Sequence, residues 1–143
     1  MYPQLEQIHE GGGSLRAVNG VFWHSENESE LPVFVALSLV FEEGEVLVAV
    51  EEDDSLFIGD EKMLRTDPAT RSVALSAMAP WNGAIGLPLL WSWTLTNQQG
   101  YVDGLQLEFA ANVESPSVLI QLLAVAGEIK VRQIPPSFMA TIY

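Results

Sequence analysis

The residue with the clearest potential for chemistry in this chain is Asp103, near the tip of a predicted β-hairpin. The strand register derived below places its carboxylate on the apolar side of the hairpin, next to Leu95 and close to Trp93 and Tyr101. A carboxylic acid buried among apolar side chains has a raised pKa and can serve as an acid or a base. In the alternative interpretation Asp103 is hydrated or bonded to amides of the turn, and Asp103→Asn then leaves any activity intact.

Neighbouring side chains extend Asp103 into a candidate binding surface. Aromatic and amide groups adapt well to ligands, although the same groups also build hairpin loops. We expect the four tryptophans to belong to the core or to a covered oligomer face, because aromatic bulk alone does not specify a sugar or a cofactor. The candidate binding surface comprises Asp103, Tyr101, Trp93, Asn97 and His24.

The chain contains no motif for catalysis, cofactor binding or metal binding. Its two histidines, His9 and His24, lie beside glutamates but lack a spacing such as H-E-x-x-H. The acidic run at 51–54 lacks the glycine-centred loop of an EF-hand, and neither a G-x-S-x-G elbow nor a dinucleotide fingerprint occurs. We therefore predict no catalytic residue, cofactor or metal, and the sequence favours a non-enzymatic protein.

The charge of the chain is strongly negative. Its 143 residues include 6 Lys and Arg against 19 Asp and Glu, a formal net charge of −13. Such a surface repels phosphate backbones and anionic lipids, so we expect neither a nucleic-acid partner nor a membrane partner. The acidic surface serves either solubility or the docking of a basic protein.

Cysteine usage and hydropathy indicate a soluble cytoplasmic protein. The chain has no cysteine, which excludes disulfides and thiolate metal sites. Its start lacks the features of a signal peptide, and no apolar run approaches the roughly 18 residues of a membrane span. We expect a single β-rich domain over 14–143, preceded by a mobile N-terminal segment at 1–13 in which Leu5 and Ile8 form a weak helical pattern.

The segment at 87–109 is predicted to form the central hairpin. Apolar and polar residues alternate in both arms, with the period of two that a half-buried strand requires. A three-residue loop at 98–100 places a glycine where a left-handed backbone is needed, whereas a four-residue loop loses aromatic–aliphatic pairs. The preferred register pairs Leu95 with Asp103, Trp93 with Leu105, Trp91 with Leu107 and Leu89 with Phe109.

A second hairpin is predicted at 32–52. A turn at Glu43-Gly44 pairs Phe41 with Val46 and leaves both faces largely apolar, which indicates central strands. The same register sets Glu42 across from Glu45, a pair of like charges that only an exposed tip tolerates.

A third hairpin is predicted at 118–134, turning at Ala126-Gly127. Its second arm alternates strictly and needs a neighbouring strand. The same residues allow a helix over 115–126, because Ser115, Pro116 and Gly127 have the types found at helix ends.

Shorter elements complete the prediction. Strands are expected at 14–23, with Asn19-Gly20 as a possible turn or bulge, and at 55–58. Asp67-Pro68 starts a short helix near 67–79, with an apolar stripe of Val73, Ala74, Ala77 and Met78, although 72–76 also allows a strand. Trp81 in the loop that follows caps the core. The fold class is therefore mainly β, with antiparallel hairpins that form a sandwich or a partly open barrel of about seven or eight strands and one short helix.

The segments at 80–86 and 91–104, together with the Leu-Gln-Leu-Glu-Phe run that follows, resemble a family of small bacterial proteins of unknown function. The resemblance covers the second half of the chain. It implies a compact bacterial domain and carries no activity or site.

Three functional hypotheses follow. The first is a non-enzymatic binding or interaction protein that self-associates as a homo-oligomer through an aromatic face or a strand edge. The second is an acidic immunity-type or inhibitor protein that neutralises a basic partner. The third is a small enzyme with a pocket around Asp103.

Overall fold

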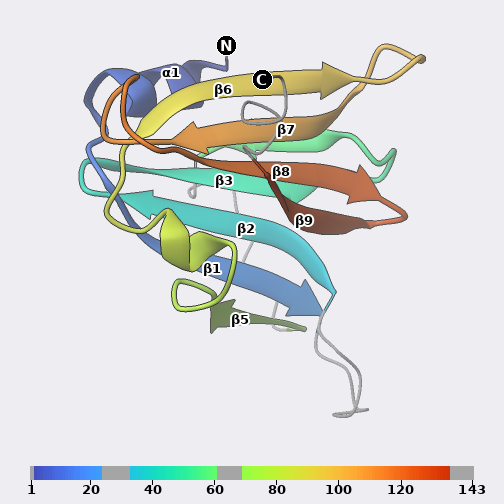
Figure 1. The fold of residues 1–143 in the computed structure, drawn as a ribbon. Helices are drawn as coiled ribbons and strands as arrows, with labels where there is room; N and C mark the ends of the chain where they lie inside the picture. The colour runs from blue at the N-terminus through green and yellow to red at the C-terminus, as the bar shows by residue number, and fades with distance from the viewer. Residues whose placement is uncertain (1, 24–32, 61–68, 136–143) are drawn as a thin grey trace.

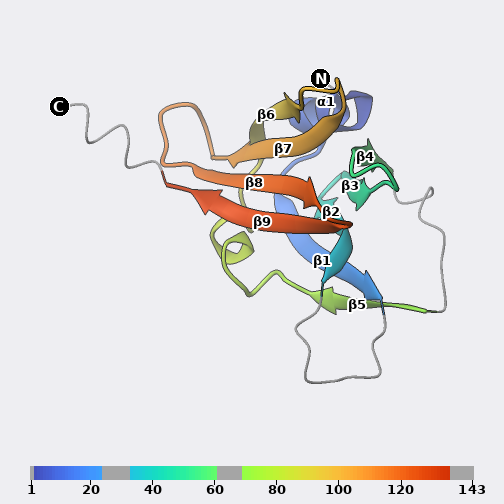
Figure 2. The same cartoon turned by 90° about the vertical axis from the view of Figure 1, so that its right-hand side faces the viewer.

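Two antiparallel β-sheets lie face to face in the computed structural model, which describes residues 2–23, 33–60 and 69–135 (Figure 1). The first sheet consists of β1 (Leu15–Trp23), β2 (Phe34–Phe41), β3 (Gly44–Val50), β4 (Leu56–Gly59) and β5 (Thr70–Ala74), in the spatial order β4–β3–β2–β1–β5. The second consists of β6 (Leu89–Thr96), β7 (Val102–Phe109), β8 (Val118–Val125) and β9 (Glu128–Ile134), in that order. The sheets do not close into a barrel, so the predicted mainly β fold is confirmed as a sandwich (Figure 2).

The core lies between the sheets, where alternate residues of the central strands meet. Leu39 of β2 and Leu107 of β7 are each 1% exposed. The rings of Phe41 and Phe109 stack across the sandwich with their centroids 6.4 Å apart. Each such buried side chain contributes roughly 1.5–3 kcal/mol relative to an exposed one, so this layer is the main source of stability.

The helix α1 (Pro3–Gly11) packs against β6, β3 and β4. Its Leu5 and Ile8 are 2% and 3% exposed and belong to the main core. The weak helical pattern seen in the sequence is thus a real helix, and its apolar side chains are buried by the sandwich. The mobility predicted for 1–13 stays a prediction, but the segment contributes to the core.

The predicted helix near 67–79 is wrong over the described residues, because 70–74 form β5. The amide of Leu75 donates to the carbonyl of Val18 at 2.8 Å, and the Ser76 hydroxyl accepts from the Val18 amide at 2.9 Å. The edge of β1 therefore supplies the hydrogen bonds that a helix would have made internally. Two members of the expected apolar stripe, Val73 and Met78, are 38% and 56% exposed. The proposed helix start at 67–68 lies outside the described residues.

The second hairpin forms with its register displaced by two residues. Phe41 pairs with Gly44 and Leu39 with Val46, so the turn is Glu42-Glu43 and the predicted Glu42–Glu45 pair does not exist. The Glu42 carboxylate instead accepts a hydrogen bond from the Ser14 amide at 2.9 Å, next to β1. A shift of two residues keeps every side chain on its predicted face. The prediction that these strands are central is confirmed, because β2 and β3 each have a neighbouring strand on both sides.

The third hairpin and the capping tryptophan are as predicted. Val125 pairs with Glu128 around a turn in which Ala126 and Gly127 have φ of 52° and 80°, so 118–125 is a strand and not a helix. Trp81, in the short 3₁₀ turn η2 (Trp81–Gly83), is 2% exposed in the core. Asn19-Gly20 is neither turn nor bulge, because β1 runs through it and pairs regularly with β2 at both residues.

Candidate functional site

The tip of the central hairpin is built around Asn97. Its amide donates to the Tyr101 carbonyl at 2.8 Å, and its side-chain oxygen accepts from the amides of Gln99 and Tyr101 at 2.9 and 3.1 Å. Gly100 has φ of 87°, which is the left-handed conformation that the three-residue loop requires. The predicted loop is therefore confirmed.

The predicted register holds at the two ends of this hairpin and fails between them. Leu89 pairs with Phe109 as expected, but Trp91 pairs with Glu108 and Trp93 with Gln106. The register shifts once after Leu89 and shifts back before Thr96. A shift of one residue turns each side chain to the other face, so the predicted burial of the indoles is wrong.

Trp91 and Trp93 consequently lie on the outer face of the second sheet. They are 44% and 46% exposed, whereas Leu105 and Leu107 on the adjacent strand fill the core. The ring of His9 in α1 stacks on Trp91 with a centroid distance of 5.5 Å and an interplanar angle of 26°. One side of Trp91 is thus held by the helix, which orients the indole on the sheet surface.

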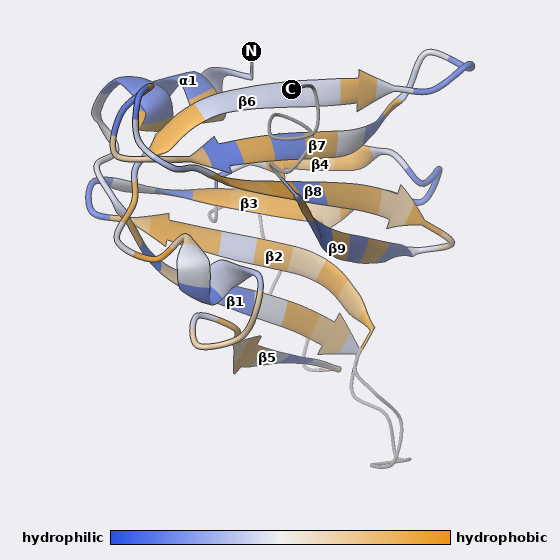
Figure 3. Ribbon diagram, viewed as in Figure 1, coloured by the Kyte–Doolittle hydropathy of each residue, from blue (hydrophilic) through white to orange (hydrophobic). Residues whose placement is uncertain are grey.

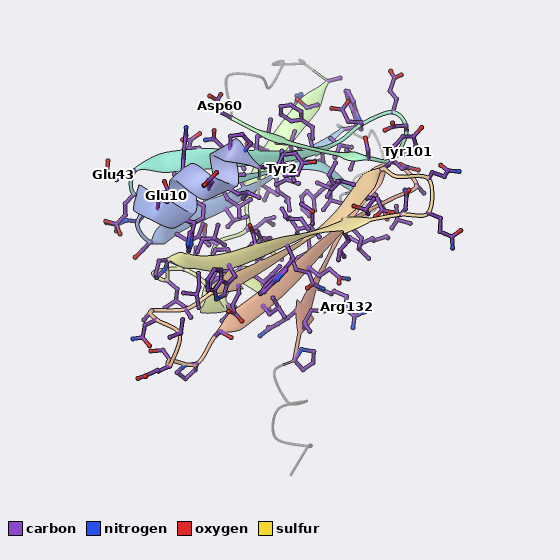
Figure 4. All side chains as sticks on the ribbon, turned by 90° about the horizontal axis from the view of Figure 1, so that it is seen from above. Tyr2, Glu10, Glu43, Asp60, Tyr101 and Arg132 are labelled. Carbon is purple, nitrogen blue, oxygen red and sulfur yellow. The ribbon has the colours of Figure 1, made fainter. Side chains whose placement is uncertain are left out.

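Polar side chains of the neighbouring strands continue this surface. Strand pairing places Gln106, Gln121 and Arg132 in one row with Trp93, and the Gln106 side-chain amide donates to the Gln121 oxygen at 2.9 Å. Arg132 is exposed at the far edge of the row (Figure 4). We call this surface the tryptophan face and define it as Trp91, Trp93, Gln106, Glu108, Gln121 and Arg132.

The structure keeps Asp103, Tyr101 and Asn97 of the predicted candidate surface together at the hairpin tip. Asp103 is the residue that the second register shift leaves without a cross-strand partner, and its carboxylate accepts a hydrogen bond from the Asn97 side chain at 3.4 Å. This is the alternative role considered for Asp103, a carboxylate bonded within the hairpin end. Tyr101 is 44% exposed at the tip, Trp93 lies on the tryptophan face, and His24 falls outside the described residues.

The amides and Arg132 of the tryptophan face were missed at the sequence level. The signal was present, since Gln106 and Gln121 alternate with the buried leucines of their strands and so had to share the outer face. Only the reversed orientation of Trp93 makes them its neighbours.

Two carboxylates elsewhere have altered acidity. Hydrogen bonds from Ser14, followed by the charge of Arg16, lower the pKa of Glu42. Hydrogen bonds from Ser55 lower the pKa of Asp53. Both groups are exposed at turns of the first sheet, so these shifts reflect turn structure and not a catalytic environment.

Within the described ranges no three His, Asp or Glu side chains gather closely enough to hold a metal ion. No helix formed by these residues has the length and apolar character needed to cross a membrane.

Comparison with known proteins identifies the family of this chain but not its activity. A family model described as a family of unknown function, DUF6334, matches residues 8–137, so the chain belongs to that family. The match extends well beyond the second half of the chain, to which the sequence resemblance is confined. No curated protein and no solved structure matches.

Proposed function

We propose that this member of the DUF6334 family is a non-enzymatic interaction protein that self-associates through the tryptophan face and the adjoining edge of β6. We further expect it to be a bacterial protein of the cytoplasm. The observation that carries the proposal is the outward orientation of Trp91 and Trp93 on an edge strand.

Exposed tryptophan pairs are costly unless something covers them. The indoles lie two positions apart on one strand face, about 7 Å along the strand, and form a contiguous apolar surface. Tryptophan is among the residues that dominate the energetics of protein interfaces, because it combines a large apolar area with few rotatable bonds. The tryptophan face therefore has the composition expected at the centre of an interface.

The edge of β6 adds backbone groups to this surface. Its eight residues, Leu89–Thr96, include no charged side chain and no proline. The edge strand β9 of the same sheet carries Lys130 and Arg132, and the edge strand β5 carries Arg71. Charges on an edge strand prevent pairing with another sheet, and β6 is the described long edge without them. Its first residue is covered by α1, because His9 Nδ1 lies 3.3 Å from the carbonyl oxygen of Leu89, so the edge available for pairing follows Leu89.

A second copy of the chain would contact the exposed indoles and pair with the edge of β6 at the same time. Antiparallel pairing of two β6 strands about a twofold axis joins the two second sheets and brings both pairs of indoles to one side of the joint. Each chain carries a formal charge of −13, so the copies repel each other outside this uncharged strand. Added salt is expected to screen that repulsion and to strengthen the dimer.

Sedimentation velocity over a wide range of protein concentration, at low and at high salt, tests the proposal. We expect a concentration-dependent dimer whose dissociation constant decreases as salt rises. A strict monomer at the highest concentration in both salts contradicts self-association. A dimer that dissociates as salt rises contradicts an interface built on the uncharged β6.

A further inference from the structure

A groove on the first sheet lies apart from the tryptophan face. It has a volume of about 630 Å³ and is formed by the end of β1, the start of β2, the end of β3 and the turn that follows. Its apolar floor includes Val21, Ala36 and Ala49, which pair side by side across three strands. These residues belong to a second, smaller hydrophobic cluster that is separate from the main core.

Apolar residues are frequent in the strands that form the groove, although Asn19 and Ser38 follow its floor on the same face. Figure 3 shows apolar residues along most of β2 and toward the end of β1. Val21 and Ala36 are 9% and 3% exposed at the bottom of the groove, and Trp23 stands 54% exposed at its rim. The groove thus offers an apolar floor and the face of an indole ring.

The opposite rim is acidic. Glu51, Glu52 and Asp54 line the groove at the β3–β4 turn. The Asp54 carboxylate accepts a hydrogen bond from the Gly127 amide at 2.7 Å, which attaches this turn to the β8–β9 turn. Glu51 and Glu52 are exposed, and neither carboxylate has an ion-pair partner among residues 2–23, 33–60 and 69–135.

We propose that this groove binds an arginine side chain on an exposed segment of a basic partner protein. The aliphatic part of arginine covers the valine and alanine floor, and its planar guanidinium stacks on the indole of Trp23. The carboxylates of Glu51 and Glu52 accept the guanidinium hydrogen bonds in a charge-assisted pair. The formal charge of −13 attracts a basic partner over a longer range and speeds its association.

This occupant is preferred over others by charge complementarity. An apolar segment alone would leave the two glutamates uncompensated, and an anionic ligand would be repelled by them. The second functional hypothesis is an acidic protein that docks a basic partner. The groove would be the place on the molecule where such a partner binds. This inference is independent of the self-association proposed above, since the groove and the tryptophan face are on different sheets.

The test uses the full chain and a short peptide of alternating arginine and glycine carrying a fluorescent label. Fluorescence anisotropy measures its binding to the wild type, and the control peptide has citrulline, a neutral isostere, in place of each arginine. We expect binding of the arginine peptide that weakens with salt and at least a roughly tenfold weaker citrulline complex. Equal binding of the two peptides overturns the proposal.

A matched pair of variants separates the groove from general attraction by an acidic protein. Glu51→Gln/Glu52→Gln and Glu10→Gln/Glu43→Gln each remove two exposed negative charges, but Glu43 precedes β3 whereas Glu51 follows it. Figure 4 shows Glu10 and Glu43 together at one end of the molecule. We expect a loss of roughly fivefold to tenfold in affinity for the groove double variant and less than about twofold for the control. Equal losses overturn the proposal.

The indole is tested in the same way. Trp23→Ala is expected to weaken arginine binding by roughly fivefold, whereas Trp93→Ala leaves it unchanged. The opposite result assigns the peptide to the tryptophan face and overturns the proposal. Sedimentation of Trp23→Ala shows separately whether self-association persists, so failure of one proposal does not conceal failure of the other.

Discussion

Replacing Trp93 by lysine is expected to abolish self-association while leaving the fold intact. Trp93 is 46% exposed. A tryptophan presents roughly 250 Å² at most, so about 115 Å² of this residue is available to a second copy. At about 25 cal/mol per Å², covering that area corresponds to about 3 kcal/mol per protomer and about 6 kcal/mol in a symmetric dimer. Association also costs ordering and desolvation, yet losing half of this value still weakens the dimer about a hundredfold.

Trp23→Lys is the matched control for this prediction. It makes the same change of residue type and charge at another exposed tryptophan, on the first sheet, where 54% of the residue is exposed. Sedimentation equilibrium of the wild type and both variants measures dimerisation, and thermal unfolding of each confirms that the fold is kept. We expect a monomer for Trp93→Lys and a dimer of unchanged strength for Trp23→Lys. The reasoning fails if the two variants behave alike or if Trp93→Lys still forms the wild-type dimer.

Three further predictions concern stability. Glu42→Gln is expected to lower the thermal unfolding temperature at neutral pH, because folding lowers the pKa of the Glu42 carboxyl. The stabilisation by the Glu42 carboxylate is therefore present above the pKa of the unfolded state and is lost as pH falls through the pKa of the folded state. Unfolding measured from neutral to acidic pH should therefore show the difference from wild type disappearing in acid, with Glu43→Gln as the neutral control. Leu5→Ala is expected to cost about 2–5 kcal/mol in urea unfolding, since Leu5 is 2% exposed, and no loss would mean that the segment at 1–13 is mobile as the sequence suggested. Gly100→Ala is expected to cost about 1–2 kcal/mol from its left-handed backbone alone, because an added Cβ meets no atom within 4 Å, and a neutral result would contradict the assigned loop.

Local signals in the sequence were sufficient where turn chemistry and alternation agreed. Gly100 and Gly127 each occupy a left-handed turn position. Alternation in both arms of the central hairpin and in the second arm of the third hairpin identified the two hairpins. The same reasoning misplaced the turn of the second hairpin, because its two apolar faces allow either register. The bond from Ser14 to Glu42 ties this turn to a distant part of the chain, which the local pattern does not reveal.

The orientation of the indoles could not be predicted, for a related reason. Two compensating shifts, after Leu89 and before Thr96, preserve the pairing at both ends of the hairpin. Any test of the register at the loop or at Phe109 therefore gives the expected answer, while the middle of the hairpin is reversed. The short helix was misassigned because hydrogen bonding of 70–74 to β1 is a tertiary effect that overrides a weak apolar stripe.

The reversed orientation is what makes β6 informative about function. Thr94, on the inward side of β6, is exposed even though its cross-strand partner Leu105 is completely buried. The sandwich therefore does not cover the inner side of this strand along its whole length, and a polar residue there is in keeping with contact with water. The large apolar side chains lie on the outer side, where Trp91 and Trp93 are 44% and 46% exposed and the ring of His9 stacks on Trp91. The inner side of β6 is polar at Ser92 and Thr94 while its outer side carries two exposed tryptophans, and this pattern supports the proposal that the outer surface is buried on association.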